Sequence, residues 1–284
     1  MTLGEAEQVT YRGDSESDIY EPWVLIRQAS GHLLIRACRD RLLSDQDVTL
    51  FSYLSSQPSA GQYRLDIPAD PKINRIDRSA KMTVRFTPVS LKRPNRLKDD
   101  YPEQVEVQAV EVAPPNGQKP VHWRLLTTHR VRTYQQALQI IQWYRWRRHI
   151  EQLFAILKQR GLDIEASENE SILAIQKLSL LALSVALQIL QLILGRKQPR
   201  TPASLAFDID QKRCLKQISS TVNGATPKQQ NPHPTASLAW AVWIIARLGG
   251  WSGYQSQRPP GIVTFRRGLH VFQGMFAGWQ LAQL

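Results

Sequence analysis

The hydrophobic pattern of the first 48 residues predicts two strands separated by a helix. Residues 32–37 (HLLIRA) form a short apolar run typical of a buried strand, and residues 19–28 before them have helical spacing. A further strand is expected to end at the acidic turn of residues 13–18 (GDSESD). The order strand, helix, strand predicts an α/β core.

Helical spacing disappears between residues 49 and 128, where apolar runs predict a set of strands. In one run Met82, Val84 and Phe86 alternate with polar residues and are expected to share one face of a sheet. This region is therefore predicted to be rich in β-structure. Its strands are expected at residues 64–67, 82–89, 104–112 and 121–128.

From residue 133 the period becomes helical again. Helices are predicted at residues 133–160, 171–194 and 238–248, and Gly249 is expected to end the last of them. Residues 178–195 form an uncharged run that is just long enough to span a bilayer. The serine and glutamine residues within it favour a buried helix of a large domain, with a transmembrane span as the alternative.

The balance of charge changes the range of partners to consider. The chain has 284 residues, with 36 Lys+Arg against 24 Asp+Glu, which gives a net charge of +12. This charge favours nucleic acid as a partner first and an anionic membrane surface second, with a basic protein that has no such partner as the alternative. The two cysteines, Cys38 and Cys214, are far apart, which excludes a disulfide framework and a cysteine zinc site. The N-terminus has no apolar signal region, so a cytoplasmic protein is expected.

One face of the helix predicted at residues 133–160 gathers groups suited to phosphate chemistry. Within a sector of about 60° on a helix lie Tyr144, Arg147, Glu151 and Lys158. Phosphoryl transfer on DNA requires such a set, because a carboxylate binds a divalent cation and the basic groups bind backbone phosphates. The alternative for Arg147 and Glu151 is an ordinary surface ion pair one helical turn apart.

Apolar side chains occupy the adjoining sector, which spans about 100°, the width of a stripe that faces a core. We therefore expect the helix to bury this side and to present the charged groups at its margin. The stripe comprises Trp143, Trp146, Ile150, Leu153, Phe154 and Leu157.

The spacing Tyr, two residues, Arg, three residues, Glu, six residues, Lys resembles the hallmark motif of bacterial DDE transposases of the insertion-sequence-4 family. Here it runs from Tyr144 to Lys158 with every interval kept. Residues 13–21 (GDSESDIYE) resemble the family's strand-end motif, although Ser15 replaces the usual arginine. Residues 121–128 (VHWRLLTT) resemble a strand that carries a functional tryptophan, here Trp123, and residues 243–269 resemble the family's closing segment.

The resemblance implies a fold as well as an activity. The expected fold is a ribonuclease-H-like α/β core, truncated at its N-terminus, interrupted by a β-rich insertion and followed by a helical C-terminal region. Residues 1–48 would be part of the core and residues 49–128 the insertion. Residues 129–200 would supply the remaining core helices, and residues 201–284 a helical interaction region.

The resemblance also assigns roles. Asp14 and Glu151 would be catalytic carboxylates and ligands of Mg²⁺, in a two-ion site of the complete protein that cleaves and rejoins DNA in cut-and-paste transposition. Binding of backbone phosphates would fall to Tyr144, Arg147 and Lys158. Trp123 would stack on a flipped base, with a sheet-face core aromatic as the alternative. The implied partners are double-stranded DNA and either a second copy or an intact transposase, with no membrane, in the bacterial nucleoid.

One part of the family's site is not found. The first catalytic aspartate of the family lies on a strand upstream of the second, and residues 1–13 contain no aspartate. We therefore expect the C-terminal portion of a transposase, without the N-terminal DNA-binding region and the first catalytic strand, and inactive alone. The alternative is a non-catalytic relative that binds DNA or pairs with an intact transposase and inhibits it.

Overall fold

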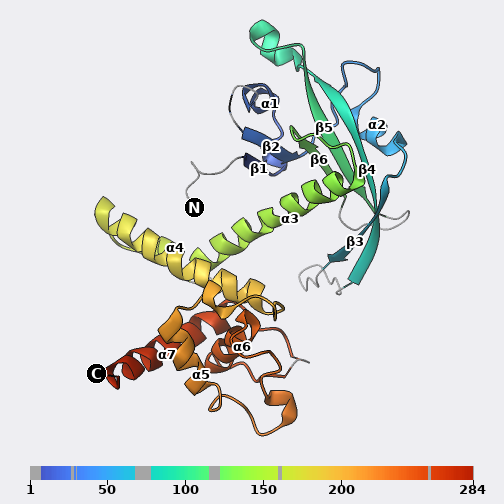
Figure 1. The fold of residues 1–284 in the computed structure, drawn as a ribbon. Coiled ribbons are helices and arrows are strands. Elements are labelled where there is room, and N and C mark those ends of the chain that lie inside the picture. Colours follow the sequence, from blue (N-terminus) through green and yellow to red (C-terminus); the bar gives the residue numbers. More distant parts are fainter. Residues whose placement is uncertain are drawn as a thin grey trace. The chain divides into compact units, whose positions relative to one another are not determined.

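A computed structural model of the chain divides into two compact units, Met1–Arg147 and Arg148–Leu284 (Figure 1). The predicted ends of three elements, residues 27–28, 121 and 159–160, lie outside the described residues. The structure describes residues 8–26, 29, 31–67, 78–114, 122–158, 162–254 and 257–283.

The first unit is built on a six-stranded mixed sheet with the strand order β1-β2-β6-β5-β4-β3. β1 (Val9–Gly13) and β2 (Gly31–Arg36) are parallel, and the short helix α1 (Glu21–Leu25) lies between them in the chain. The α/β character predicted from the strand, helix, strand order is thereby confirmed. Because the two strands run in the same direction, their carboxyl ends lie at one edge of the sheet, with Gly13 opposite Ile35.

The other four strands are antiparallel and fill the region that was predicted to be rich in β-structure. β6 pairs with β2, which joins this region and the parallel pair into one sheet. β4 and β5 form the long twisted ribbon of Figure 1. β4 continues beyond its predicted end because Leu91 is fully buried opposite Val105. The strands are β3 (Gly61–Ile67), β4 (Arg78–Lys92), β5 (Gln104–Ala113) and β6 (Trp123–Thr127).

Both faces of the sheet are covered, and the alternation along the strands decides which side chain goes where. Met82 and Val84 of β4 are fully buried in the cluster that includes side chains from the first part of α3 (Tyr134–Leu157). The opposite face packs against α1 and α2 (Leu50–Ser56), where Trp23 is fully buried. The first unit therefore has three layers, with α3 on one side of the sheet and α1 and α2 on the other.

The second unit is helical, and its core surrounds α6. A Cβ at Gly249 would lie 2.0 Å from the carbonyl oxygen of Thr264, and one at Gly268 would lie 1.9 Å from that of Ile245. The backbones of α6 and α7 therefore approach closely because neither glycine carries a side chain. The helices are α4 (Ile172–Gly195), α5 (Ile209–Ile218), α6 (Leu238–Leu248) and α7 (Ile262–Leu281).

Two of these helices, α5 and α7, are not predicted from the sequence. α5 has a clear signal at its start, because the Asp208 carboxylate accepts from the Gln211 amide and the Gln211 side chain accepts from the Asp208 amide. α7 contains three glycines, which lower its intrinsic helix propensity. It forms because Phe265, Leu269 and Phe272 fall on one face and are buried in the core.

α4 is the one helix among the described residues that is long and apolar enough to cross a membrane. About 33% of its most apolar window is buried. The prediction of a buried helix holds for its second half, where Ala186, Ile189 and Leu192 are fully buried. It is wrong for the first half, where Leu180 and Leu181 are 67% and 68% exposed.

The apolar stripe predicted along α3 is also wrong in its middle. Trp146, Ile150 and Phe154 are 44%, 44% and 53% exposed. The physical reason is that α3 contributes to two separate cores, with Ile141 in a cluster of the first unit and Ile156 in the cluster of the second. A single stripe along the whole helix does not describe both sets of contacts.

Candidate functional site

Asp14 directly follows β1, at the sheet edge where β1 and β2 end. Its Oδ1 atom accepts a hydrogen bond from the Glu16 amide at 3.0 Å and so caps a single 3₁₀ turn, Ser15–Ser17. Gly13 leaves room for this turn, because a Cβ there would lie 2.6 Å from the Cβ of Ser17. The strand end and the turn together set the direction of the Asp14 carboxylate.

Arg147 approaches Asp14 from α3. Its Nη2 atom lies 2.6 Å from Oδ2 of Asp14, although 133 positions separate the two residues in the sequence. The side chains are 24% and 37% exposed, so the pair lies at the surface of the first unit. The structure thus brings together two of the predicted site residues, and the hydrogen bond between them is charge-assisted.

Tyr144 lies one helical turn before Arg147 and is only 8% exposed. Burial raises the pKa of the Tyr144 hydroxyl, and the negative charge of Asp14 adds to this rise. The rise is opposed by the positive charges of Arg36 and Arg147 and by hydrogen bonding with Arg36. The phenol therefore keeps its proton at neutral pH. It stands within a group of two guanidiniums and one carboxylate.

Trp123 begins β6 and packs edge-on against Tyr144, with ring centroids 5.6 Å apart and ring planes at 69°. This geometry is one that aromatic pairs prefer. Trp123 is half-buried and joins the apolar cluster between the sheet and α3. It is thus a sheet-face aromatic, and the stacking of a flipped base on its exposed part stays a prediction.

Arg36 is a member of this group that sequence analysis misses. It is the last residue of β2, and its guanidinium opposes the rise in the pKa of the Tyr144 hydroxyl. Its Nη2 atom also donates to the carbonyl oxygen of His122 at 3.4 Å. The strand topology explains its position. Because β1 and β2 are parallel, the residues at their carboxyl ends lie close to one another.

Glu151 and Lys158 belong to the second unit. Both side chains are exposed, and Nζ of Lys158 lies 2.9 Å from Oε1 of Glu165. An exposed pair of this kind contributes little to stability, so Lys158 can exchange Glu165 for a phosphate at low cost. The convergence of Glu151 with Asp14 stays a prediction.

The residues described around Asp14 supply one carboxylate, and the two-ion Mg²⁺ centre stays a prediction. The two carboxylate oxygens of Asp14 already accept hydrogen bonds, one from the Glu16 amide and one from the Arg147 guanidinium. Mg²⁺ requires several oxygen ligands, and no group of three His, Cys, Asp or Glu side chains that could hold a metal is found in the described part of the chain. The site offers two guanidiniums and a phenol, which are donors suited to a phosphate.

None of the protein-family models compared with the chain matches it.

Proposed function

We propose that the chain is a DNA transposase of the insertion-sequence-4 family in a form that binds DNA and does not cleave it on its own. The observation that carries this proposal is the ion pair between Asp14 and Arg147. The resemblance requires these two residues to share one site, although the whole β-rich region separates them in the chain. A chance match of the motif gives no reason for them to meet.

The order of the elements supports the same family. The parallel strands β1 and β2 end at the candidate site, the antiparallel strands β3 to β6 follow, and α3 then returns to the site with Tyr144 and Arg147. A ribonuclease-H-like core with a β-rich insertion between its second and third acidic residues has this order. The mixed α/β sheet is compatible with such a core.

The charges around Asp14 favour a phosphate as the ligand. Arg36 and Arg147 supply two guanidiniums beside the carboxylate of Asp14, and Tyr144 adds a hydroxyl. A backbone phosphate at this group would accept charge-assisted hydrogen bonds. The net charge of +12 would attract a polyanion over longer distances and would place the chain with DNA in the nucleoid.

A non-catalytic role as an inhibitor that binds DNA or pairs with an intact transposase is the second candidate. It is favoured by exposed apolar residues on α7. Val271 and Met275, which are both 41% exposed, are suited to pairing with another helix. The two candidates share the DNA-binding step and differ in whether a partner restores cleavage.

Replacing Arg147 by glutamine should weaken the binding of a mixed-sequence duplex about tenfold and lower the slope of log affinity against log salt by about 1. The Asp14→Asn variant should bind about threefold more tightly, because it removes a negative charge beside the phosphate and releases the guanidinium. Fluorescence anisotropy in the presence of a chelator measures both effects. The chelator separates phosphate binding from any effect of divalent ions.

Two features keep this experiment specific. Asparagine at position 14 retains an acceptor for the Glu16 amide, so the turn after β1 is preserved. Arg213→Gln removes an exposed guanidinium from α5 in the other unit and serves as the charge-matched control. Equal weakening by Arg147→Gln and Arg213→Gln would contradict the proposed site, as would an Asp14→Asn variant that binds no more tightly than the wild type.

A second assay addresses cleavage. The chain alone with Mg²⁺ should leave a labelled duplex intact, because the described residues provide only Asp14 and Glu151 of the three carboxylates that the family uses. A denaturing gel measures strand breaks. Nicking that disappears in the Asp14→Asn variant would contradict the proposed lack of cleavage by this chain.

A further inference from the structure

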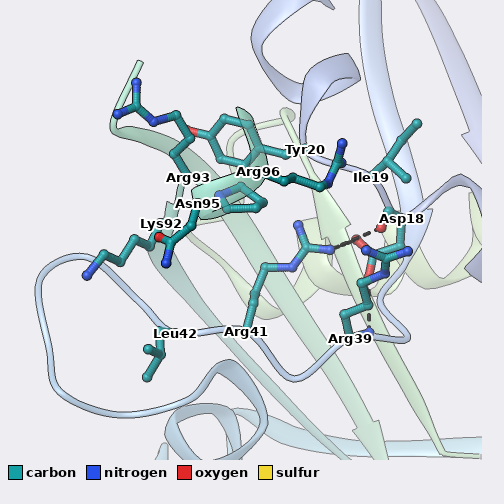
Figure 2. A pocket seen from close by; sticks show the side chains of 11 residues that line it. Asp18, Ile19, Tyr20, Arg39, Arg41, Leu42, Lys92, Arg93, Asn95 and Arg96 are labelled. Atoms are coloured by element: carbon teal, nitrogen blue, oxygen red, sulfur yellow. Dashed lines mark hydrogen bonds and ion pairs between the residues drawn. The ribbon is translucent and has the colours of Figure 1, made fainter. Parts of the chain in front are cut away.

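A basic cavity of about 380 Å³ lies on the first unit, where three separate segments meet (Figure 2). Residues 18–20 come from the connection between β1 and α1, residues 39–42 follow β2, and residues 92–96 end β4 and continue beyond it. Ligand pockets span about 300–1,000 Å³. Among the residues that the structure describes, the lining of this cavity has one carboxylate and several cations. The cations are Arg39, Arg41, Lys92, Arg93 and Arg96.

The single carboxylate of the lining, Asp18, shapes the cavity. Its side chain is buried, and its Oδ2 atom accepts from the backbone amides of Cys38 at 2.9 Å and Arg39 at 3.2 Å. Its Oδ1 atom lies 2.5 Å from Nη2 of Arg41, whose side chain reaches toward Asp18 in Figure 2. Asp18 thereby holds the loop after β2 and one guanidinium in place, and it compensates only one of the cations.

The remaining cations leave the cavity with a surplus of positive charge. Arg39 and Lys92 have exposed side chains and no ion-pair partner within the described segments. Arg96 contacts both carboxylate oxygens of Glu21, at 2.9 and 3.1 Å, and Glu21 lies outside the lining. Because like charges that face a common space repel one another, an anion in the cavity is favoured.

A second cavity, of about 620 Å³, borders the first. It shares Lys92, Arg93 and Asn95 with the first cavity and adds one carboxylate, that of Glu103. Lys92 and Arg93 border both cavities, so a strand with successive phosphates can contact them from either cavity.

The basic cavity is distinct from the candidate site around Asp14. Tyr20 in its lining belongs to the cluster on the α1 and α2 face of the sheet, whereas Tyr144 and Trp123 belong to the cluster under α3. Both sites nevertheless lie at the carboxyl edge of the parallel strands, because Asp14 follows β1 and residues 39–42 follow β2. DNA that passes along this edge would contact both.

We propose that the basic cavity binds phosphate groups of a DNA backbone, as a second contact separate from the candidate site. The phosphate chemistry follows from the cavity alone, whereas the choice of DNA rests on the proposed function. Arg39 offers a planar guanidinium for bidentate hydrogen bonds, and Lys92 offers a compact charge. Contacts of this kind position a duplex without reading its sequence.

The first test removes the two cations that have no carboxylate partner. The variant with Arg39→Gln and Lys92→Gln should bind a duplex of about 30 base pairs roughly tenfold more weakly, with a salt slope lower by about 1 to 2. Its control combines Arg200→Gln with Arg213→Gln, which removes the same charge from exposed positions in the second unit. Wild-type affinity in the Arg39 and Lys92 variant, or equal weakening in both variants, would overturn the proposal.

The second test measures whether a ligand occupies the cavity. Its outcomes distinguish the proposed phosphate site from the proposed DNA-binding function. Phenylglyoxal modifies accessible arginines, and mass spectrometry measures its rate at Arg39 and at Arg213. The duplex should slow modification of Arg39 severalfold and leave Arg213 unchanged, and inorganic phosphate should do the same at higher concentration. If phosphate protects Arg39 but the duplex does not bind, the phosphate site is supported and the proposed function is contradicted. The proposal falls if neither probe protects Arg39, or if vesicles containing phosphatidylserine protect it and the duplex does not.

Discussion

Replacing Glu111 by glutamine is expected to lower the free energy of unfolding of the first unit by about 2–4 kcal/mol. Glu111 lies on β5 with no exposed surface, and its carboxylate is shared by two guanidiniums and an imidazole. Nη1 of Arg85 lies 3.0 Å from Oε2, whereas Nε2 of His122 and Nε of Arg124 lie 2.8 and 3.3 Å from Oε1. The neutral amide would leave partly buried cations on the neighbouring strands without their common counter-charge.

The carboxylate of Glu111 is ionised at neutral pH despite its burial. Burial pushes its pKa upward, but the hydrogen bond from His122 and the charges of His122, Arg124 and Arg85 outweigh it and hold the pKa below 4.5. A carboxylate with a lowered pKa stabilises the fold above its unfolded pKa and loses this contribution as the pH falls through its folded pKa. The stabilisation by Glu111 is therefore fully present at neutral pH.

The Glu111 cluster also bears on the candidate site. Arg85, Glu111 and Arg124 lie directly opposite one another on β4, β5 and β6, so the cluster fixes the register of three strands. His122 and Arg124 flank Trp123, whose ring packs against Tyr144 on the other face of the sheet. The loss of Glu111 should therefore disturb the position of Trp123 as well as the stability of the sheet.

Hydrogen exchange measured on peptides from β4, β5 and β6 tests this prediction, because it reports on the first unit separately from the second. Glu103→Gln is the matched control, since it removes the same charge from an exposed position next to β5. The prediction fails if both variants exchange at the same rate in these strands.

The sequence predicts those features that depend on local pattern. Buried strands and alternating strands have distinct periods, so the α/β core and the β-rich region follow from runs such as residues 32–37 and 82–89. The motif resemblance places Asp14 and Arg147 in one site, which no local pattern could do for two residues that distant. Their ion pair is not predicted from the sequence. Asp208 and Gln211 have the spacing of a capping box, which is a local sequence signal for the start of α5.

The remaining features depend on contacts between distant segments. The place of Arg36 beside Tyr144 requires knowing that β2 is parallel to β1 and pairs with β6 on its other side. The exposure of Trp146 requires knowing that α3 belongs to two cores. The basic cavity is assembled from three segments that are far apart in the sequence. Hydrophobic periodicity shows which side of a helix or strand is apolar. It does not show which other segment packs against that side.

Lowering the pH from about 7 to about 4 should destabilise the first unit by about 2–3 kcal/mol through His129 alone. Burial and, to a lesser degree, the charge of His32 lower the pKa of His129 from 6.5 to about 4. Above pH 6.5 the ring is neutral in both the folded and the unfolded chain, so it has no effect on stability. Between pH 6.5 and 4 the unfolded chain binds a proton that the folded chain does not, and stability falls as the pH falls.

The surroundings of His129 explain why its protonation is unfavourable. Its Nε2 atom lies 2.9 Å from Oγ1 of Thr10 on β1, and its ring stacks on His32 of β2 with centroids 3.8 Å apart. The ring of Trp143 on α3 also contacts His129, with centroids 4.8 Å apart and the ring planes tilted by 58°. A positive charge here would weaken the packing of α3 on the parallel strands. Since Arg147 lies one turn beyond Trp143, acid should also weaken its contact with Asp14.

Urea unfolding measured at about pH 7 and about pH 5 tests this dependence. The His129→Gln variant, which cannot bind the proton, should lose less stability over this range than the wild type. His270→Gln is the control, because His270 is exposed on α7 in the other unit. An NMR titration of the imidazole protons gives the pKa of His129 directly, and a value near 6.5 would contradict the prediction. A lowered pKa together with acid-weakened DNA binding in the wild type, but not in His129→Gln, would link the packing of α3 to the candidate site.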